Sequence, residues 1–436
     1  MMVAAIALVL TIVLITLGMP VGFAAGLASL AGAAWLFGDL FDPRVGTMVA
    51  RTALDKMDTF LLLAIPFFLL AGRLMNTGGI TERLFHFVAV LVRPVRGGLG
   101  HANVLASMLF AGMSGSATAD AVGLGQIEIR AMKAAGYDHR FSAGITAASS
   151  LLSPIIPPSI VLVAYAVQAQ VSVGALFFAA IVPGLLMAAV FMAWVAYCAH
   201  RFGFPKGSRA SLAEAWSAFR SAILALLTPA IILAGIYSGI FTPTEAAAVA
   251  ALYALLVAML AYRELTWRRL LAEIRGTFID TAVMMLIIAF TSALGVVLIR
   301  SGVPAEMAAF FGTLTESPTV LLLLLLLMWL AVGLCMDQTP AILILTPILM
   351  PIVQKFGINE VHFGVVMALA LTIGLLTPPA GMVLYGLVRV TGLPYDQLVR
   401  ISAPYTFMLI GVTVVLILFP HLTLFLPRLL GFNAAG

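Results

Sequence analysis

Long apolar runs separated by short polar loops occupy most of the chain. In the first half they cover residues 2–17, 20–38, 58–76, 140–168 and 175–199. In the second half they cover residues 222–240, 243–262, 278–299, 361–389 and 403–426. Because a helix needs about 20 mostly apolar residues to cross a bilayer, we interpret each run as a membrane-spanning helix. The sequence therefore predicts an all-α polytopic membrane protein.

Two pairs of shorter apolar arms depart from this pattern. They lie at residues 98–113 with 118–134, and at residues 318–334 with 339–354. A polar tip joins the arms of each pair, at residues 114–117 and 337–339. Because arms of about 15 residues are short for a crossing, we expect two re-entrant hairpins, at about 98–134 and 318–354.

Two of the long runs contain a proline pair. Pro157 and Pro158 interrupt residues 140–168, and Pro378 and Pro379 interrupt residues 361–389. Proline removes a backbone donor and frees a carbonyl one turn earlier, so we expect two broken helices. The carbonyls at such breaks suit a cation, and half-helix N-termini suit an anionic substrate.

The two halves share an ordered series of glycines and prolines. At an offset of 221 the pairs are Gly112 with Gly333, Gly136 with Gly357, Pro157–Pro158 with Pro378–Pro379, and Pro183 with Pro404. Upstream the offset is 223, and the pairs are Pro20 with Pro243, Gly72 with Gly295, and Gly79 with Gly302. We interpret the chain as a duplication, residues 1–221 and 222–436. Five spans per repeat is an odd number, so the second repeat is predicted to be inverted, as in many secondary transporters.

Composition and charge fix the class and suggest an orientation. Hydrophobic residues make up 63% of the 436 residues and charged residues 9%, which excludes an ordinary soluble domain. The net charge of +5 comes from loops and favours a membrane orientation over nucleic-acid binding. The most basic loops alternate along the chain, which predicts that both termini lie outside the cytoplasm. The first segment lacks a basic n-region, so it is expected to be a retained span and not a signal peptide.

Several polar segments are assigned to loops or to the membrane surface. Residues 39–57 mix bases with acids and are interpreted as a loop. Four segments of mixed charge are expected to be interfacial helices: 80–96, 209–220, 264–275 and 303–315.

The hairpin tips and helix breaks carry the candidate chemistry. Hydroxyls at Ser114 and Ser116, together with freed carbonyls, offer hard oxygen ligands for sodium; the alternative is close helix packing by small residues. Asp120 is an intramembrane acid, which costs about 2.5–3.5 kcal/mol and calls for a functional reason. Asp337 lies at the second tip and is the preferred cation ligand, although it could instead bond the backbone of its own hairpin.

Nothing in the sequence indicates a nucleotide-driven pump or a metalloenzyme. There is no P-loop lysine motif, no HExxH, and the six histidines are scattered. A membrane enzyme remains an alternative, but Asp120 and Asp337 are the only acids placed for it, and their symmetric positions favour coupling-ion sites.

Seven motifs together resemble the large membrane subunit of the tripartite ATP-independent periplasmic (TRAP) transporters, over essentially the whole chain. They are AIPFFLLAG (64–72), MSGSATAD (113–120), AMKAAGYD (131–138), AASSLLSPIIPPSI (147–160), TPTEAAAVA (242–250), MDQTP (336–340) and LLTPPAGMVLY (375–385). The resemblance implies an elevator-type transporter with a scaffold and a transport domain. It also implies a bacterial inner-membrane location, Na⁺ as coupling ion, a small four-span membrane subunit and a periplasmic binding protein.

The resemblance also implies a substrate class and two sodium sites. The expected cargo is a carboxylate-bearing solute such as a dicarboxylate, sialic acid, sugar acid or keto acid. The first sodium site is expected near Ser114, Gly115, Ser116, Ser149, Ser150 and Ser153. The second is expected near Gly333, Asp337, Thr339, Thr372 and Thr377. The substrate-lining candidates are Thr118, Asp120, Pro157, Pro158, Gln338, Pro378 and Pro379. A stand-alone sodium/dicarboxylate symporter without a binding protein is the alternative.

Overall fold

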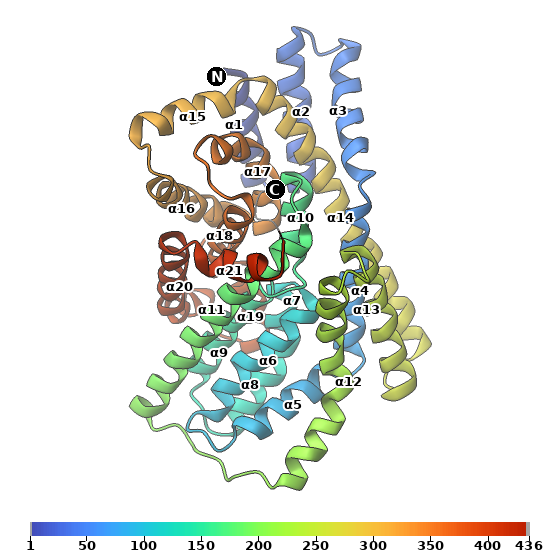
Figure 1. Ribbon diagram of the computed structural model, residues 1–436, viewed down its shortest axis with the longest axis vertical. Helices are drawn as coiled ribbons and strands as arrows, with labels where there is room; N and C mark the ends of the chain where they lie inside the picture. The colour runs from blue at the N-terminus through green and yellow to red at the C-terminus, as the bar shows by residue number, and fades with distance from the viewer. Residues whose placement is uncertain (1, 433–436) are drawn as a thin grey trace.

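The described chain is helical throughout. The computed structural model describes residues 2–432, with side chains from residue 6 onward, as helices joined by short loops (Figure 1). Within this range, the only isolated bridge between extended segments joins Arg96 to Lys206. The prediction of an all-helical membrane protein is confirmed.

Seven helical segments in the described residues are long and apolar enough to cross a membrane. Six coincide with predicted spans: Phe60–Thr77 (η1, Phe60–Leu63, with α4, Ala64–Thr77), α11 (Val173–Phe202), α12 (Leu212–Tyr237), Pro243–Ala261 (α13, Pro243–Leu256, with a π turn), α14 (Trp267–Arg300) and α20 (Tyr395–Leu418). The seventh, α16 (Pro318–Cys335), covers a segment that the sequence assigns to a hairpin arm. Its 18 residues rise about 27 Å, close to the hydrocarbon thickness of about 30 Å, so length alone does not separate a hairpin arm from a span.

The remaining predicted spans are shorter or divided. α1 (Met2–Thr16) and α2 (Val21–Phe37) have 15 and 17 residues. α2 packs closely along α14, because side chains of α14 lie over the Cα atoms of Gly22 and Gly26. Residues 140–168 and 361–389 are each divided into two helices.

The structure contradicts three of the predictions made for polar segments. Residues 43–57 form a helix, α3 (Pro43–Met57), where a loop was expected. The Asp42 side chain accepts a hydrogen bond from the backbone N–H of Arg44, and Pro43 occupies the first helical position, so the mixed charges belong to a capped helix. The segments 209–220 and 264–275 are not separate interfacial helices; they continue into α12 and α14, since no proline or glycine pair stops helix propagation there.

The same order of elements occurs in both halves. In the first, α6 (Gly98–Ser114) turns at Gly115 into α7 (Ala117–Val122) and α8 (Leu124–Ala134). A divided helix follows, made of α9 (His139–Ser149), η2 (Ser150–Leu152) and α10 (Ile160–Ala169). In the second, α16 turns into α17 (Gln338–Lys355), and the divided helix comprises α18 (Glu360–Ile373), η4 (Gly374–Leu376) and α19 (Met382–Thr391). Hereafter, residues 98–134 are the first hairpin and residues 318–355 the second.

Two short helices lie near opposite ends of the molecule. In Figure 1, α5 (Ile80–Val92) lies near the lower end and α15 (Val303–Leu314) near the upper end. Each begins after a glycine with positive φ, Gly79 or Gly302, which turns the chain sharply into the helix. These helices correspond to the segments 80–96 and 303–315 of the sequence.

Most helices fall into two packing groups, which meet where α17 packs on α14. α2, α3, α4 and α13 contact one another or α14, and α12 packs on α5. The second group joins the divided helices to α11, α16, α17 and α20, and α21 (His421–Leu429) packs on α11. The largest buried cluster is built mainly from this second group but also includes residues of α4, α13 and α14, and the hairpin tips lie beside α4 and α14.

Candidate functional site

The first hairpin turns at Gly115. This residue has φ of 61°, and an added Cβ would lie 3.2 Å from both the Pro158 carbonyl oxygen and the Ile160 nitrogen. Only glycine fits this left-handed turn so close to another backbone. The tip of the first hairpin therefore rests directly on the break between η2 and α10.

Hydroxyl groups surround this first tip. Ser116 caps α7 by accepting from the Ala119 N–H at 3.4 Å, and its Oγ lies 3.2 Å from the Thr118 hydroxyl. The Ser114 Oγ accepts from the Ser116 N–H at 3.4 Å. These long, local hydrogen bonds leave the oxygens with spare acceptor capacity.

The second hairpin turns at Asp337. Asp337 is the N-cap residue of α17, and its carboxylate faces the backbone N–H groups of Gln338 and Thr339 at the start of that helix. A carboxylate has about four lone-pair sites, so Asp337 can face these N–H groups and still bind a cation in the cavity. The next residue, Gln338, is buried and accepts from the Thr372 hydroxyl at 2.6 Å, which ties this tip to α18.

The two tips meet at one cavity. Its volume is about 120 Å³, and oxygen-bearing side chains from both hairpins line it. They are Ser116, Thr118, Asp337, Gln338 and Thr339. We call this the tip cavity. Leu69 of α4 and Met284 of α14 close it, so it lies between the two packing groups.

A larger cavity adjoins the tip cavity. Its volume is about 420 Å³, and it shares Leu69, Ser116 and Thr118 with the tip cavity. It runs along α4 and reaches Arg73 and Asp280. We call this the side cavity.

The residues predicted for the first sodium site fall into separate environments. The tip residues Ser114, Gly115 and Ser116 lie together. Ser149 and Ser153 instead bond to polar side chains of the first hairpin, and the Ser150 hydroxyl donates to the Ala147 carbonyl in the last turn of α9. The hydrogen bonds of the described residues do not join the tip to these serines.

Asp120 lies inside a buried polar network and does not line either cavity. Its carboxylate accepts from Ser153 at 2.8 Å and from Ser107 at 3.3 Å. The Ser107 hydroxyl also lies 3.2 Å from that of Ser149, which donates to Asn103. Asp120 is only 1% exposed, and its hydrogen bonds join the first hairpin to the break after η2.

The network ends at an acid that sequence reasoning missed. Asn103 donates to Glu128 at 2.6 Å and to Thr146 at 2.7 Å, and Glu128 is 0% exposed. The other Glu128 oxygen has no partner among the described residues. The sequence does contain a sign of this network. Asn103 and Ser107 are four residues apart in an apolar arm, so they lie on one helix face, and Glu128 lies in the other arm of the same hairpin.

The residues predicted for the second sodium site lie closer together. Gly333 of α16 and Gly374 of η4 touch backbone to backbone, since a Cβ added to Gly333 would lie 3.2 Å from the Gly374 Cα. Thr372 reaches Gln338, while Thr377 bonds the Gly374 carbonyl at 3.1 Å. The end of α16, the start of α17 and the break after α18 thus form one junction.

The proline pairs occupy different surroundings. Pro157 and Pro158 are buried beside the first tip, whereas Pro378 and Pro379 are exposed. The Pro379 carbonyl accepts from the hydroxyls of Tyr385 at 3.4 Å and Tyr395 at 3.3 Å. Both proline–proline peptide bonds are cis. Neither pair lines the tip cavity or the side cavity.

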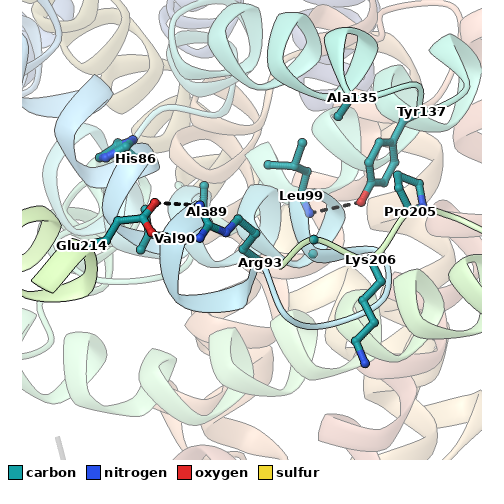
Figure 2. Close-up of a pocket in the computed structure, with 12 residues that line it drawn as sticks. His86, Ala89, Val90, Arg93, Leu99, Ala135, Tyr137, Pro205, Lys206 and Glu214 are labelled. Atoms are coloured by element: carbon teal, nitrogen blue, oxygen red, sulfur yellow. Dashed lines mark hydrogen bonds and ion pairs between the residues drawn. The ribbon is translucent and has the colours of Figure 1, made fainter. Parts of the chain in front are cut away.

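A third cavity, of about 380 Å³, lies away from the tips (Figure 2). It lies between α5, the start of α6 and the loop before α12, with Tyr137 and Leu99 on one side. Arg93 and Glu214 form a two-pronged ion pair across it, at 2.7 and 2.9 Å. Because it shares no lining residue with either hairpin tip, we assign its ion pair to joining α5 to α12.

The tip cavity has the donor set of an alkali-cation site. Hydroxyl, amide and carboxylate oxygens line it, and these hard ligands suit Na⁺. Among the described residues, no three His, Cys, Asp or Glu side chains gather as transition-metal ligands would.

Sequence comparison identifies the family. Residues 8–422 match the family described as "Tripartite ATP-independent periplasmic transporter, DctM component". The sialic acid TRAP transporter large permease protein SiaM of Vibrio cholerae is 43% identical over 412 residues, covering 94% of this chain and 95% of that protein. The 2,3-diketo-L-gulonate TRAP transporter large permease protein YiaN of Escherichia coli is 39% identical, covering 94% and 95%. The C4-dicarboxylate TRAP transporter large permease protein DctM of Pseudomonas aeruginosa is also 39% identical, covering 90% and 92%.

A solved structure shares the fold. The YdaH transporter of Alcanivorax borkumensis matches with a TM-score of 0.63 over 91% of this chain and 96% of that one, at 17% sequence identity. The match over residues 8–422 and the near-full-length relatives agree, and the chain belongs to the DctM family of TRAP transporter large permease subunits.

Proposed function

We propose that this permease imports a carboxylate-bearing organic solute across a bacterial inner membrane, driven by a sodium gradient. The protein is a multi-pass transporter subunit and not an enzyme. The named substrates of its relatives, sialic acid, C4-dicarboxylates and 2,3-diketo-L-gulonate, all carry carboxylates, and this supports the proposed class. A periplasmic binding protein would deliver the solute, and a small four-span membrane subunit would complete the complex.

The meeting of the two hairpin tips at one cavity carries this proposal. Ser116 and Thr118 from one hairpin face Asp337 and Thr339 from the other across about 120 Å³. Such convergence of hard oxygen ligands at broken and hairpin helices is typical of ion-coupled transporters. Asp337 is our first choice for a direct sodium ligand, because it supplies the carboxylate among the described residues that line the tip cavity.

We further propose that the chain consists of two inverted repeats, residues 1–221 and 222–436, with both termini in the periplasm. The repeated order of hairpin and divided helix supports this division. The placement of α5 and α15 near opposite ends of the molecule also supports it (Figure 1). In an elevator cycle, the hairpins and divided helices would move as a transport domain against α2, α4, α13 and α14.

Uptake of labelled organic acids into proteoliposomes tests the function. The vesicles would contain this chain with its small membrane subunit, and would be assayed with and without the binding protein and an inward sodium gradient. We expect uptake only when both are present. Uptake with sodium alone would favour the stand-alone symporter, and uptake that persists when potassium replaces sodium would contradict sodium coupling.

A further inference from the structure

The size of the tip cavity excludes a whole sugar acid. Small-molecule sites usually measure about 300–1,000 Å³, whereas the tip cavity holds about 120 Å³. That space suits ions and a few waters. The adjoining side cavity, at about 420 Å³, is within the range for an organic acid.

Arg73 of α4 is the one basic side chain among the residues that line either cavity. Its guanidinium donates to Glu273 at 3.2 Å and to Asp280 at 2.5 Å, both on α14. It lies over Gly276, where an added Cβ would come within 2.5 Å of one of its terminal nitrogens. The two acids, and the space left by the missing side chain of Gly276, fix the position of this cation at the wall of the side cavity.

The fixed guanidinium retains donors for a ligand. Of its five N–H groups, two are used by Glu273 and Asp280, and three remain. The side chain is 35% exposed and borders the cavity. Arginine binds carboxylates through parallel N–H donors, so a planar guanidinium held in one orientation suits a carboxylate better than a free cation would.

We propose that Arg73 binds the carboxylate of the transported solute in the side cavity, with Ser114, Ser116 and Thr118 as hydroxyl partners along the same wall. This inference rests on the proposed function. It assigns the ion to the tip cavity and the organic anion to the side cavity, and Ser116 and Thr118 border both.

A different role for the cluster gives a different result. Arg73, Glu273 and Asp280 together carry a net charge of −1 when all are ionised, so the cluster could instead attract sodium. In that case, removal of Arg73 would leave the solute KM unchanged and lower the sodium concentration needed for half-maximal uptake.

The test compares Arg73→Gln and Arg73→Lys with wild type in the reconstituted complex, using the labelled acid that the wild type takes up. We expect Arg73→Gln to raise the solute KM about tenfold or more, with the sodium dependence unchanged. Arg73→Lys keeps the charge without the planar fork, so its KM should lie between the two. The melting midpoint in detergent monitors folding.

Arg83→Gln is the matched control. Arg83 also forms an ion pair at a helix contact, with Glu264 at 2.6 Å, but it lines neither cavity. Its loss should leave the solute KM unchanged. An equal rise in KM for Arg83→Gln, or no rise for Arg73→Gln, would overturn the assignment.

Asp280→Asn separates binding from a purely structural tie. This variant removes one of the two acids that fix the guanidinium but keeps Arg73 and Glu273, so the solute KM should rise less than in Arg73→Gln. Equal rises in KM for Asp280→Asn and Arg73→Gln, with equal falls in the melting midpoint, would show that the cluster only joins α4 to α14. If the wild type takes up no acid at all, the proposed function fails, an outcome distinct from unaltered kinetics in the variants.

Discussion

Replacing Gly374 with alanine should damage the junction between the second hairpin and its divided helix. The new Cβ would lie 2.7 Å from the Gly333 Cα and 2.8 Å from its carbonyl carbon, and closer still to the carbonyl oxygen. All three atoms are backbone, so none can rotate away. The φ and ψ of Gly374, −55° and −28°, already suit alanine, so any cost must come from the collision.

The collision should outweigh the gain in helix propensity. Alanine in a helix is about 1 kcal/mol more favourable than glycine, whereas inserting a methyl group into a close-packed contact costs about 1–3 kcal/mol, occasionally more. To remove this collision, α16 and η4 would have to move apart by several tenths of an ångström. Because Thr372 and Asp337 lie on the two sides of this junction, we expect sodium-dependent uptake to fall at least tenfold.

Thermal unfolding in detergent and uptake in proteoliposomes measure the two effects. Gly312→Ala in α15 is the control, because an added Cβ there meets nothing within 4 Å. It should melt at or above the wild-type midpoint and transport normally. If Gly374→Ala melted like Gly312→Ala and kept its sodium dependence, the proposed tight junction would be refuted.

Three further changes test the polar groups around the tips. Asp337→Ala should abolish sodium-dependent uptake while membrane insertion and the gel-filtration profile stay as in wild type; unchanged sodium dependence would contradict its role as ligand. Asn103→Ala removes a side chain that hydrogen-bonds Glu128, Thr146 and Ser149 inside the buried network, so the melting midpoint should fall by the equivalent of about 1–3 kcal/mol or more; a midpoint at the wild-type value would contradict a stabilising role for this network. Thr372→Val strips the bond to buried Gln338 and should cost about 1–3 kcal/mol, read in the same melting assay.

The apolar pattern predicted most of the helices but not where all of them end. Runs such as 175–199 and 243–262 are found as helices because length and hydrophobicity suffice to define a span. The loop assigned to residues 39–57 is wrong because helix capping by Asp42 and Pro43 is a local signal that mixed charge obscures. The continuity of α12 and α14 was missed for a related reason: a change from polar to apolar composition need not interrupt backbone hydrogen bonding.

The candidate site was predicted at the level of segments and only partly at the level of side chains. The predicted tips supplied Ser116, Thr118 and Asp337, which line one cavity, whereas the proline pairs line neither cavity. The sequence does not reveal that Asp120 turns inward, because its direction depends on Ser107 and Ser153 reaching it from other helices.

Arg73 was missed for the same kind of reason. Its place beside the hairpin depends on how α4 packs against α14, and in the sequence it is a lone base at the end of an apolar run.

The arrangement of the two cavities suggests how an ion and a solute could be coupled. Coupling requires that each ligand alter the affinity for the other, and the effect must be reciprocal. Ser116 and Thr118 form the common wall of the two cavities, and Ser116 also caps α7, so any ion that draws on these hydroxyls changes the surface offered to the solute. At Gly115 the same turn packs directly against the backbone of the break before α10, and this contact restricts movement of the tip. If the ion and the solute occupy the two cavities as proposed, the shortest route between them would run through this one turn of the first hairpin, without a long chain of contacts.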